Sequence, residues 1–266
     1  MRAGGDMALQ GKNRGNKIIG FLLKKGIVTF ALLLAVWQAA SMYNDANFLP
    51  GPARTLIGGW EILKNGVLLD YVAISFMRIF AGWSIGIVCA IPIGLAVGQF
   101  ALVREIFEPF VNFFRFVPAI GFLTLFLMWF GVEEESKIAI IVYATIFPVT
   151  INTIAGVVSI DKIKTRVAQS QGASPFQIFY TVTVPASAPS IFTGIRLGLS
   201  GAIVSIVAAE MLAAQSGIGY LIYTSRLYFR TDWIFVGILT LGLSGYFSDR
   251  LLRLFGSTAL KRYGVK

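Results

Sequence analysis

Few side chains in this 266-residue sequence could do covalent chemistry. Histidine is absent and Cys89 is the only cysteine. These facts exclude histidine acid–base catalysis, a disulfide framework and a Cys/His zinc site. The stretch Gly11-Lys12-Asn13 also lacks the earlier glycine and the following Ser or Thr of a phosphate-binding loop. We therefore expect a protein that is not an enzyme and holds no metal or cofactor of its own.

The polar residues that attract attention lie inside long apolar runs. Arg78 and Glu210 fall toward one end of their runs, and a charge inside a membrane is costly enough to need a partner or a function. We expect them to pair, with snorkelling to the membrane surface or contact with a substrate as alternatives. Three more candidates for contact with a polar solute are Thr150, Asn152 and Thr153, although a hydroxyl in such a run can simply bond to its own helix.

The elements that carry these residues are expected to be membrane-spanning helices. The chain is 56% hydrophobic and only 14% charged, with a mean hydropathy of +0.74, whereas soluble domains are about 45–50% apolar and about 25% charged. A helix needs about 20 apolar residues to cross a bilayer. The apolar runs are residues 27–42, 72–103, 117–132, 138–158, 190–214 and 233–255. We therefore predict an all-α polytopic membrane protein with about six transmembrane helices.

The distribution of Lys and Arg predicts the orientation. With the amino terminus inside, 15 of them lie in cytoplasmic segments and five in external ones, leaving out Arg115, which we place at the membrane edge. This satisfies the positive-inside rule and puts both termini in the cytoplasm. The net charge of +10 alone would suggest nucleic-acid binding, but the charges are not clustered among stacking aromatics. We expect the lipid bilayer and no nucleic acid as a partner.

These boundaries divide the chain into five segments. They are a basic cytoplasmic arm (1–26), a first transmembrane helix (27–43), an external segment with an amphipathic helix (44–71), a transmembrane core (72–256) and a cytoplasmic tail (257–266). A cleaved signal peptide ending near Ala39-Ala40-Ser41 is the alternative for the first two segments. It is disfavoured because the rest of the chain is itself polytopic.

The loop 159–189 contains signals of a defined structure. Ser159 or Asp161 can cap a short helix that ends at Gly172, and Ser174-Pro175 can start a second one. We expect Pro185 to end that second helix. The aromatic side chains Phe176, Phe179 and Tyr180 would share one face of it. Such a face suggests a docking surface for a partner, and a helix lying on lipid is the alternative.

The loop also resembles a known signature. Arg166-Val167-Ala168, Gly172 and Val182-Thr183-Val184-Pro185 are similar in order and spacing to the EAA loop, Glu-Ala-Ala…Gly…Leu-Pro, of permease subunits of ATP-driven, binding-protein-dependent (ABC) importers. Other motifs resemble the branch that imports sulfonates, taurine, nitrate or bicarbonate. They are Phe48-Leu49-Pro50-Gly51-Pro52, Arg115-Phe116-Val117-Pro118, Leu127-Met128-Trp129-Phe130-Gly131 and Ser216-Gly217-Ile218-Gly219-Tyr220.

The resemblance implies a mechanism and partners. It implies a homodimer in a prokaryotic inner or plasma membrane, two ATPase subunits that bind the ATP and Mg²⁺, and a periplasmic or lipid-anchored solute-binding protein. It also implies that the 159–189 loop couples to the ATPase, with contacts from Arg166, Ala168, Gly172, Ala173, Phe176, Phe179 and Pro185. Arg166 departs from the family, because it replaces the acidic residue of the signature.

Two other functions are compatible with the apolar composition. An ion-gradient-driven secondary transporter would need acidic residues at mid-depth and an internal repeat, and we find only Glu210, near the end of its run, and no clear repeat. A membrane scaffold that transports nothing would not need the capped loop. Copurification with an ATPase subunit discriminates among the three functions.

Overall fold

A computed structural model describes residues 26–263, so the basic arm lies outside it except for Gly26, as do residues 264–266 of the tail. All regular elements of this part are helical. In chain order they are α2 (Ile27–Met42), α3 (Pro52–Lys64), α4 (Val67–Gln99), α5 (Ala101–Phe114), η1 (Ala119–Phe122), α6 (Leu123–Phe130), α7 (Glu134–Val158), α8 (Lys162–Ser170), α9 (Pro175–Ile178), η2 (Phe179–Thr183), α10 (Val184–Ala213), α11 (Ile218–Leu227), α12 (Thr231–Ala259) and η3 (Lys261–Tyr263).

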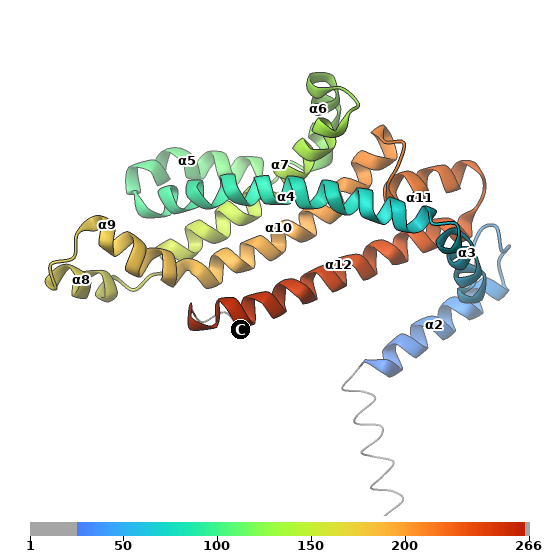
Figure 1. Ribbon diagram of the computed structural model, residues 1–266, viewed down its shortest axis with the longest axis horizontal. Coiled ribbons are helices and arrows are strands. Elements are labelled where there is room, and N and C mark those ends of the chain that lie inside the picture. The colour runs from blue at the N-terminus through green and yellow to red at the C-terminus, as the bar shows by residue number, and fades with distance from the viewer. Residues whose placement is uncertain (1–25, 264–266) are drawn as a thin grey trace, which may run out of the picture.

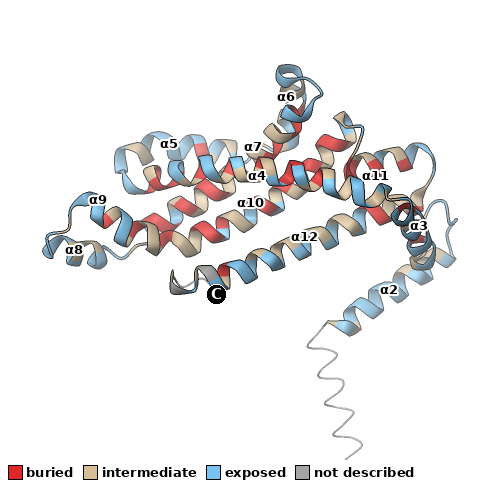
Figure 2. Ribbon diagram, in the orientation of Figure 1, coloured by how far each residue is buried: buried red, intermediate tan, exposed pale blue. Residues whose placement is uncertain are grey.

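Three long helices, α4, α7 and α10, form the centre of the fold, and α7 makes its most extensive contacts with the other two. α12 runs beside them along the long axis (Figure 1). The short helices α8 and α9 lie at one end of this bundle, whereas α3 and α11 lie at the other (Figure 1). Buried residues concentrate on α4, α7 and α10, and α2 is largely exposed (Figure 2).

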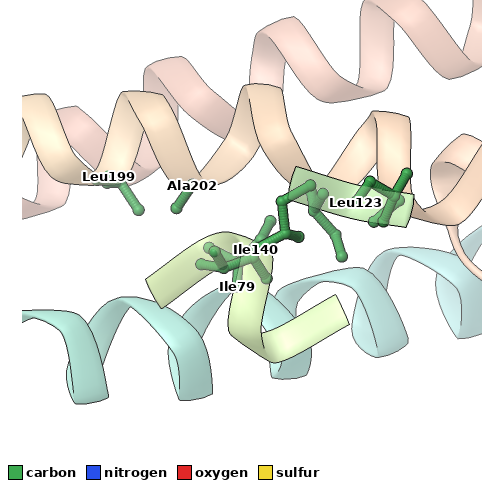
Figure 3. Packing of buried hydrophobic residues seen from close by; sticks show 8 residues of the cluster. Ile79, Leu123, Ile140, Leu199 and Ala202 are labelled. Carbon is green, nitrogen blue, oxygen red and sulfur yellow. The ribbon is translucent and has the colours of Figure 1, made fainter. Parts of the chain in front are cut away.

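Glycines let α4 and α7 approach closely. A Cβ atom added at Gly94 would lie 2.5 Å from Cβ of Thr153, and one at Gly86 would lie 2.7 Å from Cβ of Thr145. Small residues at helix contacts of this kind are typical of membrane bundles. The main apolar cluster joins α4, α7, α10 and the start of α6. Figure 3 shows it and labels Ile79, Leu123, Ile140, Leu199 and Ala202.

By length and apolar composition, three described helices can cross a membrane: Val67–Gln99, Glu134–Val158 and Pro175–Ala213. The helices Ala101–Phe114 and Ala119–Phe130 can together form a fourth crossing. This crossing is broken, because the two helices are bent by 88° relative to each other. α2 is apolar but has 16 residues, and α12 coincides with the sixth predicted run without being among these helices. The predicted runs thus all fall on helices, while the number of crossings stays a prediction.

Two predicted spans differ from the observed helices. The run 117–132 is not one span, because the chain turns sharply before η1 and only the short helix α6 follows. The run 190–214 is the end of a helical stretch that begins at Pro175. In both cases neighbouring helices decide the local path, which apolar periodicity does not encode.

The helix expected in the segment 44–71 is α3, and charges join it to α12. The guanidinium of Arg230 lies 2.7 Å from Glu61 and 3.0 Å from Asp232. Hydrogen bonds to the carboxylates of Asp232 and Glu61 raise the pKa of Arg230 above its usual range. The apolar side chains Ile62, Leu221 and Val236 pack together beside this ion group. This end of the bundle is therefore held by several elements.

Candidate functional site

The first half of the 159–189 loop is the helix α8, with defined caps at both ends. Asp161 accepts a hydrogen bond of 2.8 Å from the backbone N–H of Ile163. At the other end Gly172 has a φ of 81°, and its N–H bonds to Gln169 O at 2.9 Å while Ala173 N–H bonds to Ala168 O at 3.1 Å. This is the Schellman arrangement, which needs a residue that tolerates positive φ. The predicted turn at Gly172 is thus present.

The second half of the loop begins as predicted and then departs from the prediction. Ser174 and Gln177 form a capping box, with Pro175 at the first turn of α9. The sequence predicts that Pro185 ends this helix, and that prediction is wrong. Pro185 lies in the first turn of α10. The π-helical turn η2 (Phe179–Thr183) joins α9 to α10. Because its wider backbone spacing can admit a residue without an N–H, the helix continues through the proline.

The prediction that three aromatic side chains share one face of this helix is only partly correct. Phe176 and Tyr180 are 70% and 56% exposed, with ring centroids 4.6 Å apart. Phe179 instead turns inward and packs against the cluster of Leu95, Val157 and Ile191. Phe179 lies at the edge of this face, next to the buried Ile178, and therefore packs on the bundle side. Two of the three aromatics remain available to a partner.

A groove of about 600 Å³ separates α8 from the start of α10. Ala168 and Pro185 line it from the two sides, together with Val167 and Tyr263, so the carboxyl-terminal end of the chain reaches this loop. Arg166 lies nearby on α8, exposed and without an ion pair to any described residue. The loop therefore presents apolar side chains, a groove and a free cation at one end of the bundle.

A polar cluster lies toward the other end, which we call the Arg78 cluster: the buried Ser75 and Arg78 of α4 and Glu210 of α10, with the exposed Glu134 of α7. Arg78 Nη1 donates to Glu210 at 2.9 Å, and its Nε and Nη2 donate to the two oxygens of Glu134 at 2.6 and 2.7 Å. Glu210 also accepts from Ser75 Oγ at 2.7 Å and from Gly219 N–H at 2.8 Å. Every acceptor of Glu210 is used, which is the usual condition for burying a carboxylate.

The chain between α10 and α11 folds back onto this cluster. Ser216 O accepts from Arg78 at 2.8 Å, and Ile218 N–H donates to Ser75 Oγ at 2.9 Å. Gly217 has a φ of 112°, and a Cβ added there would lie 2.3 Å from Glu210. Only glycine meets both conditions. The cluster thus ties this loop to three long helices, which is a positioning role and not a catalytic one.

Sequence reasoning found the Arg78–Glu210 pair but missed Glu134 and Ser75. A signal for Glu134 was present, because it lies four residues before the fourth apolar run, at the external end to which Arg78 was assigned. Nothing in the sequence distinguished Ser75 from other serines in the runs. Its role depends on the return of the chain at Ile218.

The polar residues predicted for the pathway have packing partners in the structure. Thr150 and Thr153 are buried, with hydroxyls donating to Ala90 O at 3.5 Å and Val149 O at 2.7 Å. The amide of Asn152 donates to Pro148 O at 2.8 Å. Among the described residues, none of these three lines one of the larger cavities of the bundle, whereas Ile151, which lies between them in the sequence, lines two. Their contact with a solute stays a prediction.

Residues 82–259 match the family described as binding-protein-dependent transport system inner membrane component. The chain belongs to this family. It is therefore a permease subunit of an ABC importer and a multi-pass membrane protein, not an enzyme.

The chain is similar in sequence to permeases of the branch that the motifs predicted. The chain is 37% identical to a probable ABC transporter permease of Brucella melitensis, over 85% of this chain and 92% of the relative. It is 34% identical to the taurine transport system permease TauC of Escherichia coli, over 85% of each chain. It is 28% identical to the nitrate import permease NrtB of Synechocystis sp., over 86% of each.

The fold agrees with a solved structure as well. An inward-facing structure of the MetNI methionine ABC transporter superposes with a TM-score of 0.60 at 18% identity, covering 74% of this chain and 96% of that one. This likeness confirms the predicted all-α permease fold.

Proposed function

We propose that the chain forms, with a second copy of itself, the transmembrane pathway of an ATP-driven importer for a small solute that carries an anionic group. The names of the taurine, sulfonate and nitrate relatives support this class of solute. The sequence motifs that resemble the same branch support it independently. Bicarbonate belongs to the same proposal on the motifs alone.

The observation that carries the coupling part of the proposal is the continuity of the loop with a spanning helix. α9 passes through η2 into α10 as one helical stretch of 39 residues, Pro175–Ala213. A force applied at Phe176 or Tyr180 would therefore reach the middle of the bundle along a single stiff element. Rigid-body movements of this kind underlie alternating access in transporters.

The proposed partners are two ATPase subunits on the two 159–189 loops and an external solute-binding protein. ATP and Mg²⁺ would be bound by the ATPase subunits. Because Arg166 stands where the family signature has an acidic residue, we expect the ATPase to present a carboxylate, not a cation, to this position. Arg166, Ala168, Gly172, Ala173, Phe176 and Pro185 form the proposed contact or its support, and Phe179 anchors it to the bundle.

An ion-coupled mechanism has less support. It would depend on Glu210 taking up and releasing a proton or binding Na⁺. That carboxylate is 1% exposed and already bonded to Arg78, Ser75 and Gly219. A group with all its acceptors used in a static contact is better suited to holding the loop at Gly217 than to carrying an ion.

Copurification tests the proposal. The chain is coexpressed with a candidate ABC ATPase subunit from the same organism, and the two are isolated together through a tag on the permease. Phe176→Ala should reduce the recovered ATPase severalfold, because it removes the most exposed aromatic of the loop. Phe48→Ala removes an equally exposed phenylalanine outside the loop and should leave the recovery unchanged. Equal recovery with both variants would contradict a docking role for this face.

A further inference from the structure

The break between α5 and η1 is a built feature. Tyr143 of α7 donates its hydroxyl to Phe114 O at 2.9 Å and lies 3.4 Å from Val117 O. The ring of Phe147 stacks on Phe114 with centroids 6.3 Å apart, and Phe122 packs on Tyr143 at 4.6 Å. The middle of α7 therefore holds both sides of the break.

A cavity of about 460 Å³ opens at this break, which we call the break cavity. One wall is the break itself, with Arg115. The others are the middle turns of α7, around Tyr143 and Phe147, and of α10, around Ser200 and Ser205. Both of these walls belong to long apolar helices that can cross a membrane, so Arg115, although exposed on the single chain, lies beside two candidate spans. The sequence placed Arg115 at the membrane edge, and its depth stays a prediction.

Arg115 has no carboxylate to neutralise it. Within residues 26–263 its guanidinium makes no hydrogen bond or ion pair, and its recorded contact is the ring of Phe116 at 4.6 Å. In contrast, Arg78 and Arg196 in the neighbouring spans are each bonded to carboxylates. No Asp or Glu is among the described residues that line the break cavity. An unpaired cation beside helices that cross a membrane is costly unless it has a partner or a function.

The other polar groups of the cavity are hydroxyls that can donate. Ser205 is buried and has no hydrogen-bond partner among the described residues, while Ser200 makes one long bond of 3.4 Å to Arg196 O. The next cavity along α7, of about 330 Å³, differs from the break cavity in the charged groups that line it. There Arg104 is bonded to the carbonyls of Val97 and Gly98, and Glu108 lines the same space.

We propose that Arg115 binds the anionic group of the transported solute in the break cavity, with Ser200 and Ser205 as further donors. The planar guanidinium suits an oxyanion such as a sulfonate, nitrate or carboxylate, because it can donate two parallel hydrogen bonds. Broken helices at mid-depth are also where transporters place their substrates. This inference rests on the proposed function and names the residue that would select the solute.

Uptake measures the role of the charge. The complex of permease, ATPase and binding protein is reconstituted and assayed with labelled taurine, nitrate and an alkanesulfonate. For the solute that the unaltered complex transports, Arg115→Gln should lower uptake at least about tenfold, and Arg115→Lys should lower it less, because charge-assisted hydrogen bonds are lost or weakened. Arg226→Gln removes another exposed arginine with no recorded partner and should transport normally. The variants should assemble in equal amount.

Two failures are distinguishable. If the unaltered complex transports none of these anions, the proposed solute class is wrong, and the inference falls with it. If it transports one of them and Arg115→Gln matches Arg226→Gln, the inference alone is overturned, and Arg115 is a surface cation.

A second measurement needs no knowledge of the solute. In a Cys89→Ser background, Ser200→Cys places a thiol in the wall of the break cavity, and its reaction rates with an anionic and a cationic methanethiosulfonate are compared in membranes. Adding Arg115→Gln should lower the anionic-to-cationic rate ratio about tenfold, because the nearby positive charge no longer attracts the anionic reagent. Adding Arg226→Gln should leave the ratio unchanged. An unchanged ratio with Arg115→Gln would overturn the proposal.

Discussion

Arg78 of α4 and Glu210 of α10 form an ion pair of 2.9 Å in which the two side chains are 6% and 1% exposed. Two charges at such a depth are stable only when their remaining hydrogen-bonding groups are also satisfied. Glu134, Ser75 and the backbone after Gly217 satisfy them. The pair therefore works as part of a network that fixes the loop between α10 and α11.

Removing Arg78 should be severe, because it leaves the buried carboxylate of Glu210 without its cation. We expect Arg78→Met to destabilise the protein by about 3–5 kcal/mol, the usual cost of breaking a buried pair. Arg196→Met is the control. It breaks the ion pair with Asp249, in which the two side chains are 28% and 33% exposed, and should cost about 0–1 kcal/mol. Thermal unfolding of the two variants in detergent measures the difference. Equal losses would contradict the structural role of the Arg78 cluster.

Exchanging the charges of the pair should fail to restore the protein. In Arg78→Glu with Glu210→Arg, the new carboxylate at position 78 faces Glu134, which lies 2.6 Å from Arg78 in the native protein. Like charges at this distance repel. Adding Glu134→Gln should therefore recover more assembled complex than the double exchange alone, as measured by the amount purified. Full recovery by the double exchange would show that Glu134 is dispensable.

The turn at Gly172 can be tested through its backbone alone. No atom lies within 4 Å of a Cβ added there, so a substitution changes only the ease of adopting a φ of 81°. A β-branched residue pays about 1–2 kcal/mol in this region, while asparagine pays less. We expect Gly172→Val to reach the membrane but to bind less ATPase, and Gly172→Asn to bind nearly as much as the native chain. Normal copurification of Gly172→Val would mean that the turn is not needed for docking.

Local signals in the sequence predicted the parts of the fold that depend on local chemistry. The cap at Asp161, the turn at Gly172 and the start at Ser174 follow from side chains that bond to their own backbone. The apolar runs predicted the helices for the same reason, since their length matches a bilayer. The Arg78–Glu210 pair was accessible because both charges lie inside apolar runs, toward the same predicted external side.

The features that the sequence did not predict depend on contacts between distant segments. The break before η1 is held by Tyr143, which follows it by more than twenty residues. Phe179 turns inward because the cluster of Leu95, Val157 and Ile191 lies beside it, and η2 lets the helix pass through Pro185. The place of Arg115 in the wall of the break cavity also follows from the break. Such arrangements are decided by packing, which the periodicity of one segment cannot report.

The orientation in the membrane gives the last prediction. α8 and α3 lie at opposite ends of the bundle (Figure 1), and the excess of Lys and Arg on the side of α8 predicts that α8 lies in the cytoplasm. In a Cys89→Ser background, Lys64→Cys at the end of α3 should react with an impermeant maleimide in intact cells. Ser170→Cys at the end of α8 should react only after the membrane is permeabilised, although both positions are exposed on the protein. Labelling of position 170 in intact cells, with position 64 protected, would invert the topology and place the coupling loop on the wrong side for an ATPase.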